Sequence, residues 1–109
     1  MKILEEISVG GRNKVCPSDI ILMEGNINYS KLFLIDGKTI FVATTLKTLS
    51  EKLENHNFFR THKSFLINLN HVESFEDNMP LKMTNQSFVC VSRRRKTLLK
   101  AAMGSFVST

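Results

Sequence analysis

Tryptophan is absent from this sequence of 109 residues, tyrosine occurs once, and no acidic residue follows Asp77. No apolar run approaches the roughly 20 residues that a membrane-spanning helix requires. The first residues are acidic and carry no long apolar stretch, so they do not resemble a secretory signal. We therefore expect neither a membrane span nor a secretory leader, and a cytoplasmic protein with no membrane partner.

Cysteine is also scarce, which bears on how the fold is held together. Hydrophobic residues make up 42% of the chain and include eight Phe, enough to bury a core without a metal or a disulfide. We therefore expect one domain over residues 1–109. Cys16 and Cys90 belong to no paired motif. We interpret them as two buried thiols in a reducing compartment, with a disulfide or a redox sensor as the alternatives.

Positive charge is concentrated near the end of the chain. Residues 1–77 carry nine Lys and Arg against ten acidic residues, whereas residues 78–109 carry six Lys and Arg and no acid. An asymmetry this sharp indicates one face or end that is built to meet an anion.

Local patterns predict a mainly β fold, with about eight short strands and two short helices. The clearest hairpin joins strands at 31–35 and 39–43 through Asp36-Gly37, because Asp-Gly tolerates positive φ. Leucines at helical spacing predict a helix over 45–53, capped by Thr44 or Thr45. A second helix is expected from Ser92 to Gly104. Residues 65–70 are interpreted as a turn of helix or a bend, and Glu24-Gly25-Asn26 as the end of a strand. The other expected strands are 5–9, 14–16, 20–23, 58–62, 72–75, 81–84 and 88–91.

The most informative segment is the start of the last helix, where Arg93, Arg94, Arg95 and Lys96 follow Ser92. A helix N-terminus carries partial positive charge and favours acidic residues, so four cations there cost stability. The free backbone N–H groups at that end also point toward any bound anion. A phosphate backbone would supply the missing negative charge, and a solvated surface run is the alternative.

Two further polar segments are candidates for the same role. Arg60, His62, Lys63 and Ser64 lie in a stretch without acidic residues, where a Lys-Ser tip offers a charged donor and a hydroxyl. An ordinary exposed strand is the alternative there. The second segment, 28–31, carries Asn, Tyr, Ser and Lys before the Asp-Gly hairpin. Judged from its residues alone, it is better explained as a plain loop.

Enzymatic chemistry finds little support in the sequence. His56, His62 and His71 lack the spacing of a zinc site, and neither a phosphate-binding Gly-rich loop nor a nucleophile elbow occurs. One carboxylate near the cationic segments, Glu24, supports no acid–base pair. We expect no catalytic residue, metal, cofactor or small-molecule substrate.

Three segments in order resemble the LytTR family of bacterial DNA-binding domains. Residues 59–69, Phe-Arg-Thr-His-Lys-Ser-Phe-Leu-Ile-Asn-Leu, are similar to the family's hallmark stretch. Residues 19–24, Asp-Ile-Ile-Leu-Met-Glu, resemble its Asp-Ile and Ile-Glu segment, with Met23 where Ile or an aromatic is usual. Residues 91–96, Val-Ser-Arg-Arg-Arg-Lys, resemble its Val-Ser-Arg-Arg run. The likeness covers about residues 7–103.

The resemblance implies elongated antiparallel sheets with one or two short helices, and loops rather than a recognition helix that enter successive major grooves. It implies contacts to bases or phosphates from Tyr29 or Asn28, from Lys63 and from Arg94. With their neighbours, the candidate DNA-binding residues are Asn28, Tyr29, Lys31, Arg60, His62, Lys63, Ser64, Ser92, Arg93, Arg94, Arg95 and Lys96.

The expected partner is therefore double-stranded DNA, read by sequence in transcription regulation, with a homodimer possible on tandem sites. The alternative is a protein-interaction module that pairs with a full-length LytTR regulator and modulates it. RNA binding is less favoured, because Tyr29 is the only tyrosine or tryptophan available for stacking. Most family members carry an upstream receiver domain, for which we expect no room here, so the regulatory input is open.

Overall fold

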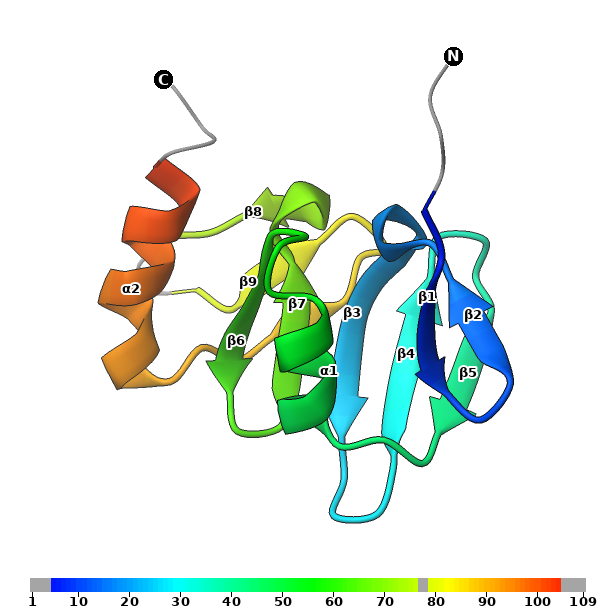
Figure 1. The fold of residues 1–109 in the computed structure, drawn as a ribbon. Helices are drawn as coiled ribbons and strands as arrows, with labels where there is room; N and C mark the ends of the chain where they lie inside the picture. The colour runs from blue at the N-terminus through cyan, green and yellow to red at the C-terminus, as the bar shows by residue number, and fades with distance from the viewer. Residues whose placement is uncertain (1–4, 77–78, 105–109) are drawn as a thin grey trace.

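The computed structural model describes residues 5–76 and 79–104, and within them the chain forms ten strands and two α-helices (Figure 1). All strand pairs are antiparallel. The strands are β1 (Ile7–Gly10), β2 (Asn13–Val15), β3 (Ile20–Gly25), β4 (Ser30–Leu34), β5 (Thr39–Val42), β6 (Phe58–His62), β7 (Phe65–Asn68), β8 (Val72–Ser74), β9 (Leu81–Met83) and β10 (Phe88–Val89). The mainly β fold with two short helices is as expected.

A five-stranded sheet in the order β5-β4-β3-β7-β6 forms the centre of the molecule. Its middle strand, β3, begins with four consecutive buried apolar residues, as a strand covered on both faces should. The expected strand over 20–23 is two residues too short, because β3 continues to Gly25. The predicted Asp36-Gly37 hairpin is present between β4 and β5, and Gly37 has a φ of 87°.

The interpretation of residues 65–70 as a helical turn or a bend was wrong. Phe65–Asn68 is strand β7, paired with β3 on one side and β6 on the other, and only Leu69–His71 forms a short 3₁₀ turn. A short apolar run does not distinguish strand from helix by periodicity. Asn68 is buried, and its side-chain amide donates to the carbonyls of Ile20 and Pro17, at 2.9 and 3.3 Å.

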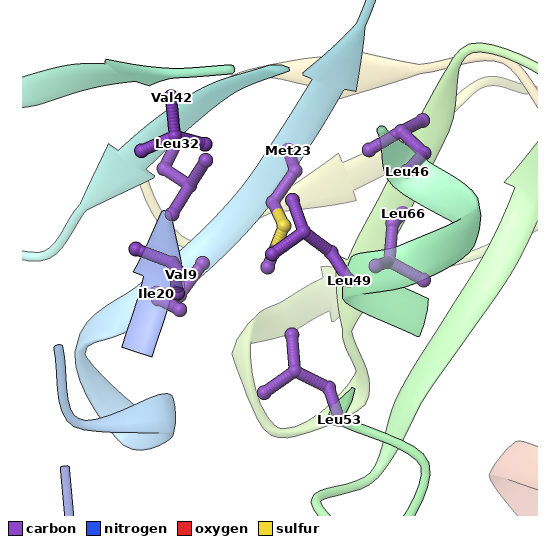
Figure 2. Packing of buried hydrophobic residues seen from close by; sticks show 9 residues of the cluster. All are labelled: Val9, Ile20, Met23, Leu32, Val42, Leu46, Leu49, Leu53 and Leu66. Atoms are coloured by element: carbon purple, nitrogen blue, oxygen red, sulfur yellow. The ribbon is translucent and has the colours of Figure 1, made fainter. Parts of the chain in front are cut away.

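One face of the central sheet is covered by helix α1 (Leu46–Lys52) and the β1–β2 hairpin. Thr45 caps the helix, as its hydroxyl accepts a hydrogen bond from the N–H of Thr48. Figure 2 shows Leu46 and Leu49 of α1 directed at the sheet, beside Met23 of β3 and Leu66 of β7. The predicted leucine stripe therefore packs against the core.

The opposite face carries a second core between the central sheet, the three-stranded sheet β10-β9-β8 and helix α2 (Arg93–Gly104). Leu99 anchors α2 in this core and is fully buried with Leu81, Met83 and Ile67. The helix starts directly after Ser92, whose carbonyl accepts from the N–H groups of Arg95 and Lys96.

The two cysteines are free, as expected, but only Cys16 is buried. The prediction of two buried thiols was wrong for Cys90, which follows β10 and is exposed. Val89 points into the core, so the side chain of the next residue in an extended segment points outward. In the described part of the chain, no helix is long and apolar enough to cross a membrane.

Candidate nucleic-acid interface

Three of the connections between elements lie along one edge of the molecule. The β3–β4 loop, the β6–β7 turn and the start of α2 occupy the lower edge of Figure 1. The first two are joined directly, because the N–H of Gly25 at the end of β3 donates to the carbonyl of Ser64 at 2.8 Å. We call this row the basic edge; its segments are residues 25–30, 60–65 and 92–96.

The β6–β7 turn is held in shape by two of the candidate residues. Arg60 donates from Nε to the carbonyl of His62 at 3.1 Å and from Nη2 to the carbonyl of Lys63. The N–H of Ser64 donates to Nδ1 of His62 at 3.2 Å, so this nitrogen acts as an acceptor. Arg60 and His62 therefore brace the turn, while Lys63 is exposed at its tip.

Two arginines, Arg60 of β6 and Arg95 of α2, lie close together beside the turn. Arg95 donates from Nη1 to the backbone carbonyl of Arg60 at 3.2 Å, which ties α2 to β6. Burial lowers the pKa of Arg60, and the positive charge of Arg95 lowers the same pKa further. Both effects disfavour the charged form of Arg60. An anion near Arg60 and Arg95 would therefore stabilise the charged guanidinium of Arg60.

The β3–β4 loop is closed tightly at its base. The N–H of Asn26 donates to the carbonyl of Tyr29 at 2.8 Å, and the side-chain oxygen of Asn26 accepts from the N–H of Ile27 at 2.6 Å. Ile27 is thereby left 89% exposed next to the exposed Asn28. The sequence interpretation missed Ile27; an apolar residue between two asparagines was its available signal.

Two other candidates of this region lie against aromatic rings. The ring of Tyr29 meets that of Phe41 edge-on, with centroids 5.6 Å apart. The ammonium of Lys31 lies 5.0 Å from the ring centroid of Phe33 and 5.7 Å from that of Phe41. Lys31 thus extends over the sheet face, whereas Tyr29 remains 41% exposed at the loop.

At the start of α2, Arg93, Arg94 and Arg95 are exposed. A hollow of 640 Å³ joins this helix start to the β6–β7 turn and brings Arg94 next to Lys63; its lining residues are His62, Lys63, Ser92, Arg94, Arg95 and Leu98. Lys96 is half-buried and lines a different hollow, with Met79 and Cys90. Of the candidates in this segment, the hollow therefore groups Ser92, Arg94 and Arg95, whereas Arg93 and Lys96 lie outside it.

Three adjoining hollows connect most of the candidate residues into one row; Asn28, Arg93 and Lys96 line none of the three. The hollow at Tyr29 and Lys31, which also includes the carboxylate of Glu24, shares Gly25 with a central hollow. The central hollow shares Lys63 with the hollow that contains Arg94. Tyr29, Lys63 and Arg94 therefore belong to one continuous surface and are not scattered over opposite faces.

The fold is thus of the class of small β domains with a row of loops at one edge, and the cationic side chains along this row suit it to an anionic ligand. The family model for the LytTr DNA-binding domain matches residues 11–104, and the chain therefore belongs to the LytTR family of DNA-binding domains. The sequence expectation of this family is confirmed.

Two individual proteins are similar to the chain. It is 28% identical over 107 residues to the sensory transduction protein LytT of Enterococcus faecalis. The aligned region covers 92% of this chain and 44% of that protein. The chain thus spans less than half the length of this curated relative. The fold matches that of a LytTr DNA-binding domain of a putative methyl-accepting/DNA response regulator from Bacillus cereus. The TM-score is 0.76 and the identity 21%, with 95% of this chain and 99% of that one covered.

Proposed function

We propose that this domain binds double-stranded DNA in a sequence-specific manner in transcription regulation, with the basic edge facing the duplex. The row of adjoining hollows from Tyr29 through Lys63 to Arg94 carries the proposal, because it supplies three separate contact points on one side of the molecule. In this arrangement the β3–β4 loop, the β6–β7 turn and the start of α2 enter successive major grooves.

The residues of the basic edge take different roles in this proposal. Arg94 is exposed and pairs with guanine through N7 and O6, a contact worth about 1–3 kcal/mol of discrimination. Lys63 and Ser64 meet the duplex from the turn that Arg60 and His62 brace. Arg93 and Arg95, with the hydroxyl of Ser92, hold phosphates. Asn28 and Tyr29 approach from the β3–β4 loop.

Selection of bound duplexes from a random pool, followed by a salt titration, tests this function. We expect an enriched sequence and four to six phosphate contacts, which correspond to a log–log salt slope of about −4 to −5. Failure to enrich any sequence, or a flat salt response, would contradict the proposal.

Sedimentation of the complex on a tandem site tests whether two copies bind together, as a dimer on repeated sites requires.

Arg94→Lys separates base reading from simple charge attraction. Lysine keeps the positive charge but cannot form the planar two-point contact with guanine. We expect affinity for the selected duplex to fall by about 10-fold or more, with affinity for random duplex nearly unchanged. The competition ratio between the two duplexes measures this effect. Equal losses on both duplexes would show that Arg94 does not read a base.

A further inference from the structure

The central hollow of the basic edge includes a helix that the sequence interpretation left out of the interface. This hollow has a volume of 470 Å³ and lies between the end of β3, the start of α1 and the β6–β7 turn. Three of its lining residues are cationic: Lys47, Arg60 and Lys63. The full lining is Gly25, Asn26, Ile27, Thr45, Leu46, Lys47, Arg60, Lys63 and Ser64, without a carboxylate.

Lys47 reaches this hollow because α1 lies close against β3. A Cβ atom on Gly25 would lie 2.5 Å from Cγ of Leu46, so only glycine leaves room for the leucine. Leu46 is 4% exposed, which fixes the rotation of the helix. Each helical residue turns by about 100°, so Lys47 is directed away from the core and is exposed at the mouth of the hollow.

Among the described residues, no carboxylate lines this hollow to balance its positive charge, and that of Glu24 lies in the adjoining hollow. The ion pairs of His56 with Glu5 and of Lys82 with Glu73 involve no lining residue. Arg60 is already destabilised in its charged form by burial and by Arg95, and its pKa is lowered accordingly. A cationic hollow with an unbalanced charge and a hydroxyl, that of Ser64, has the chemistry of a phosphate site.

We propose that the central hollow binds one phosphate group, held between the ammonium groups of Lys47 and Lys63 with the hydroxyl of Ser64. If this group is a backbone phosphate of the duplex, α1 becomes a fourth DNA-contacting element, between the β3–β4 loop and the β6–β7 turn. The assignment of the phosphate to DNA rests on the proposed function. Inorganic phosphate has the same chemistry and is the second possible source of the group.

The test compares Lys47→Met with Lys38→Met on the whole chain. Both changes remove one exposed lysine, but Lys38 lies in the β4–β5 turn, at the opposite end of β4 from the β3–β4 loop. We expect Lys47→Met to weaken selected and random duplexes alike, by about five-fold at 0.15 M salt, and to make the log–log slope shallower by about 0.9. Lys47→Arg should retain binding, and Lys38→Met should match the unsubstituted chain.

Equal binding by Lys47→Met and Lys38→Met, with normal binding by the unsubstituted chain, would overturn the duplex contact while leaving the proposed function intact. A phosphate titration followed by amide chemical shifts separates the two sources. Saturable shifts at Gly25, Leu46 and Ser64 that Lys47→Met abolishes, without any duplex binding, would support the site and contradict the proposed function. Absence of both responses would overturn the site itself.

Discussion

At the scale of single residues, Arg60 changes role between sequence and structure. The sequence offers it as a DNA contact because it lies among basic residues and in a family motif. In the structure its guanidinium donates to the carbonyls of His62 and Lys63, so it holds the turn that presents Lys63. A positively charged side chain in a binding motif can thus act on the ligand through the backbone that it positions.

Arg60→Lys tests this bracing role without a change of charge. A single ammonium cannot reproduce the planar pair of donors that reaches two carbonyls, so we expect the turn to loosen. Hydrogen exchange at the amide of Gly25, which is bonded to Ser64, should become several-fold faster. The salt slope of DNA binding should stay the same while affinity falls.

Arg93→Lys is the matched control for this change, because Arg93 is exposed on the first turn of α2. It should leave the exchange rate at Gly25 as it is. Unchanged exchange at Gly25 in Arg60→Lys would mean that the turn keeps its shape without the guanidinium, and the assignment of Arg60 as a positioning residue would be wrong.

At the scale of elements, the close packing of α1 against β3 depends on the absence of a Cβ atom at Gly25. Gly25→Ala would place a methyl group against the buried Leu46, and overpacking of this kind costs about 1–3 kcal/mol. Urea unfolding should report that loss. Gly104→Ala is the control, since nothing lies within 4 Å of a Cβ at the last residue of α2. It should be neutral or slightly stabilising, so equal stabilities of the two variants would contradict the close packing at Gly25.

Elements specified by local sequence could be predicted, whereas those that depend on tertiary pairing could not. The Asp36-Gly37 hairpin and helix α1 are specified locally, by turn residues, a threonine cap and leucine spacing, and both were predicted. Strand β7 pairs with its sequence neighbour β6 and with β3, which lies about forty residues earlier in the chain, so its local pattern alone was ambiguous. The exposure of Cys90 likewise depends on how β10 packs.

The candidate site was likewise predictable in its segments but not in their arrangement in space. Its three segments were predicted from motifs, but their alignment along one edge requires the strand order of the central sheet. Lys47 was not among the candidate residues, because nothing in the sequence near residue 47 indicates that α1 starts beside the β6–β7 turn. That contact is created by tertiary packing through Gly25 and Leu46.

At the scale of the whole molecule, two cores lie on opposite faces of one sheet, and the core on the α2 side positions the arginines of the basic edge. Leu53 belongs to the core under α1, and Leu99 belongs to the core that anchors α2; both are fully buried. Leu53 follows the last residue of α1, far along the helix from Lys47. The arginines of α2 instead depend on Leu99 for their position, and Arg95 adds one bond to β6.

Leu99→Ala and Leu53→Ala should therefore separate stability from DNA binding. Each removes a similar buried volume, and we expect each to lower the free energy of unfolding by about 2–5 kcal/mol. At low temperature, with affinities corrected for the folded fraction from urea titrations, Leu99→Ala should still bind the selected duplex several-fold more weakly, because α2 no longer holds Arg94 in place. Leu53→Ala should bind normally after the same correction, and Leu99→Val should give an intermediate result. Normal corrected affinity in Leu99→Ala would show that the position of α2 does not determine recognition, and would leave the β3–β4 loop and the β6–β7 turn as its source.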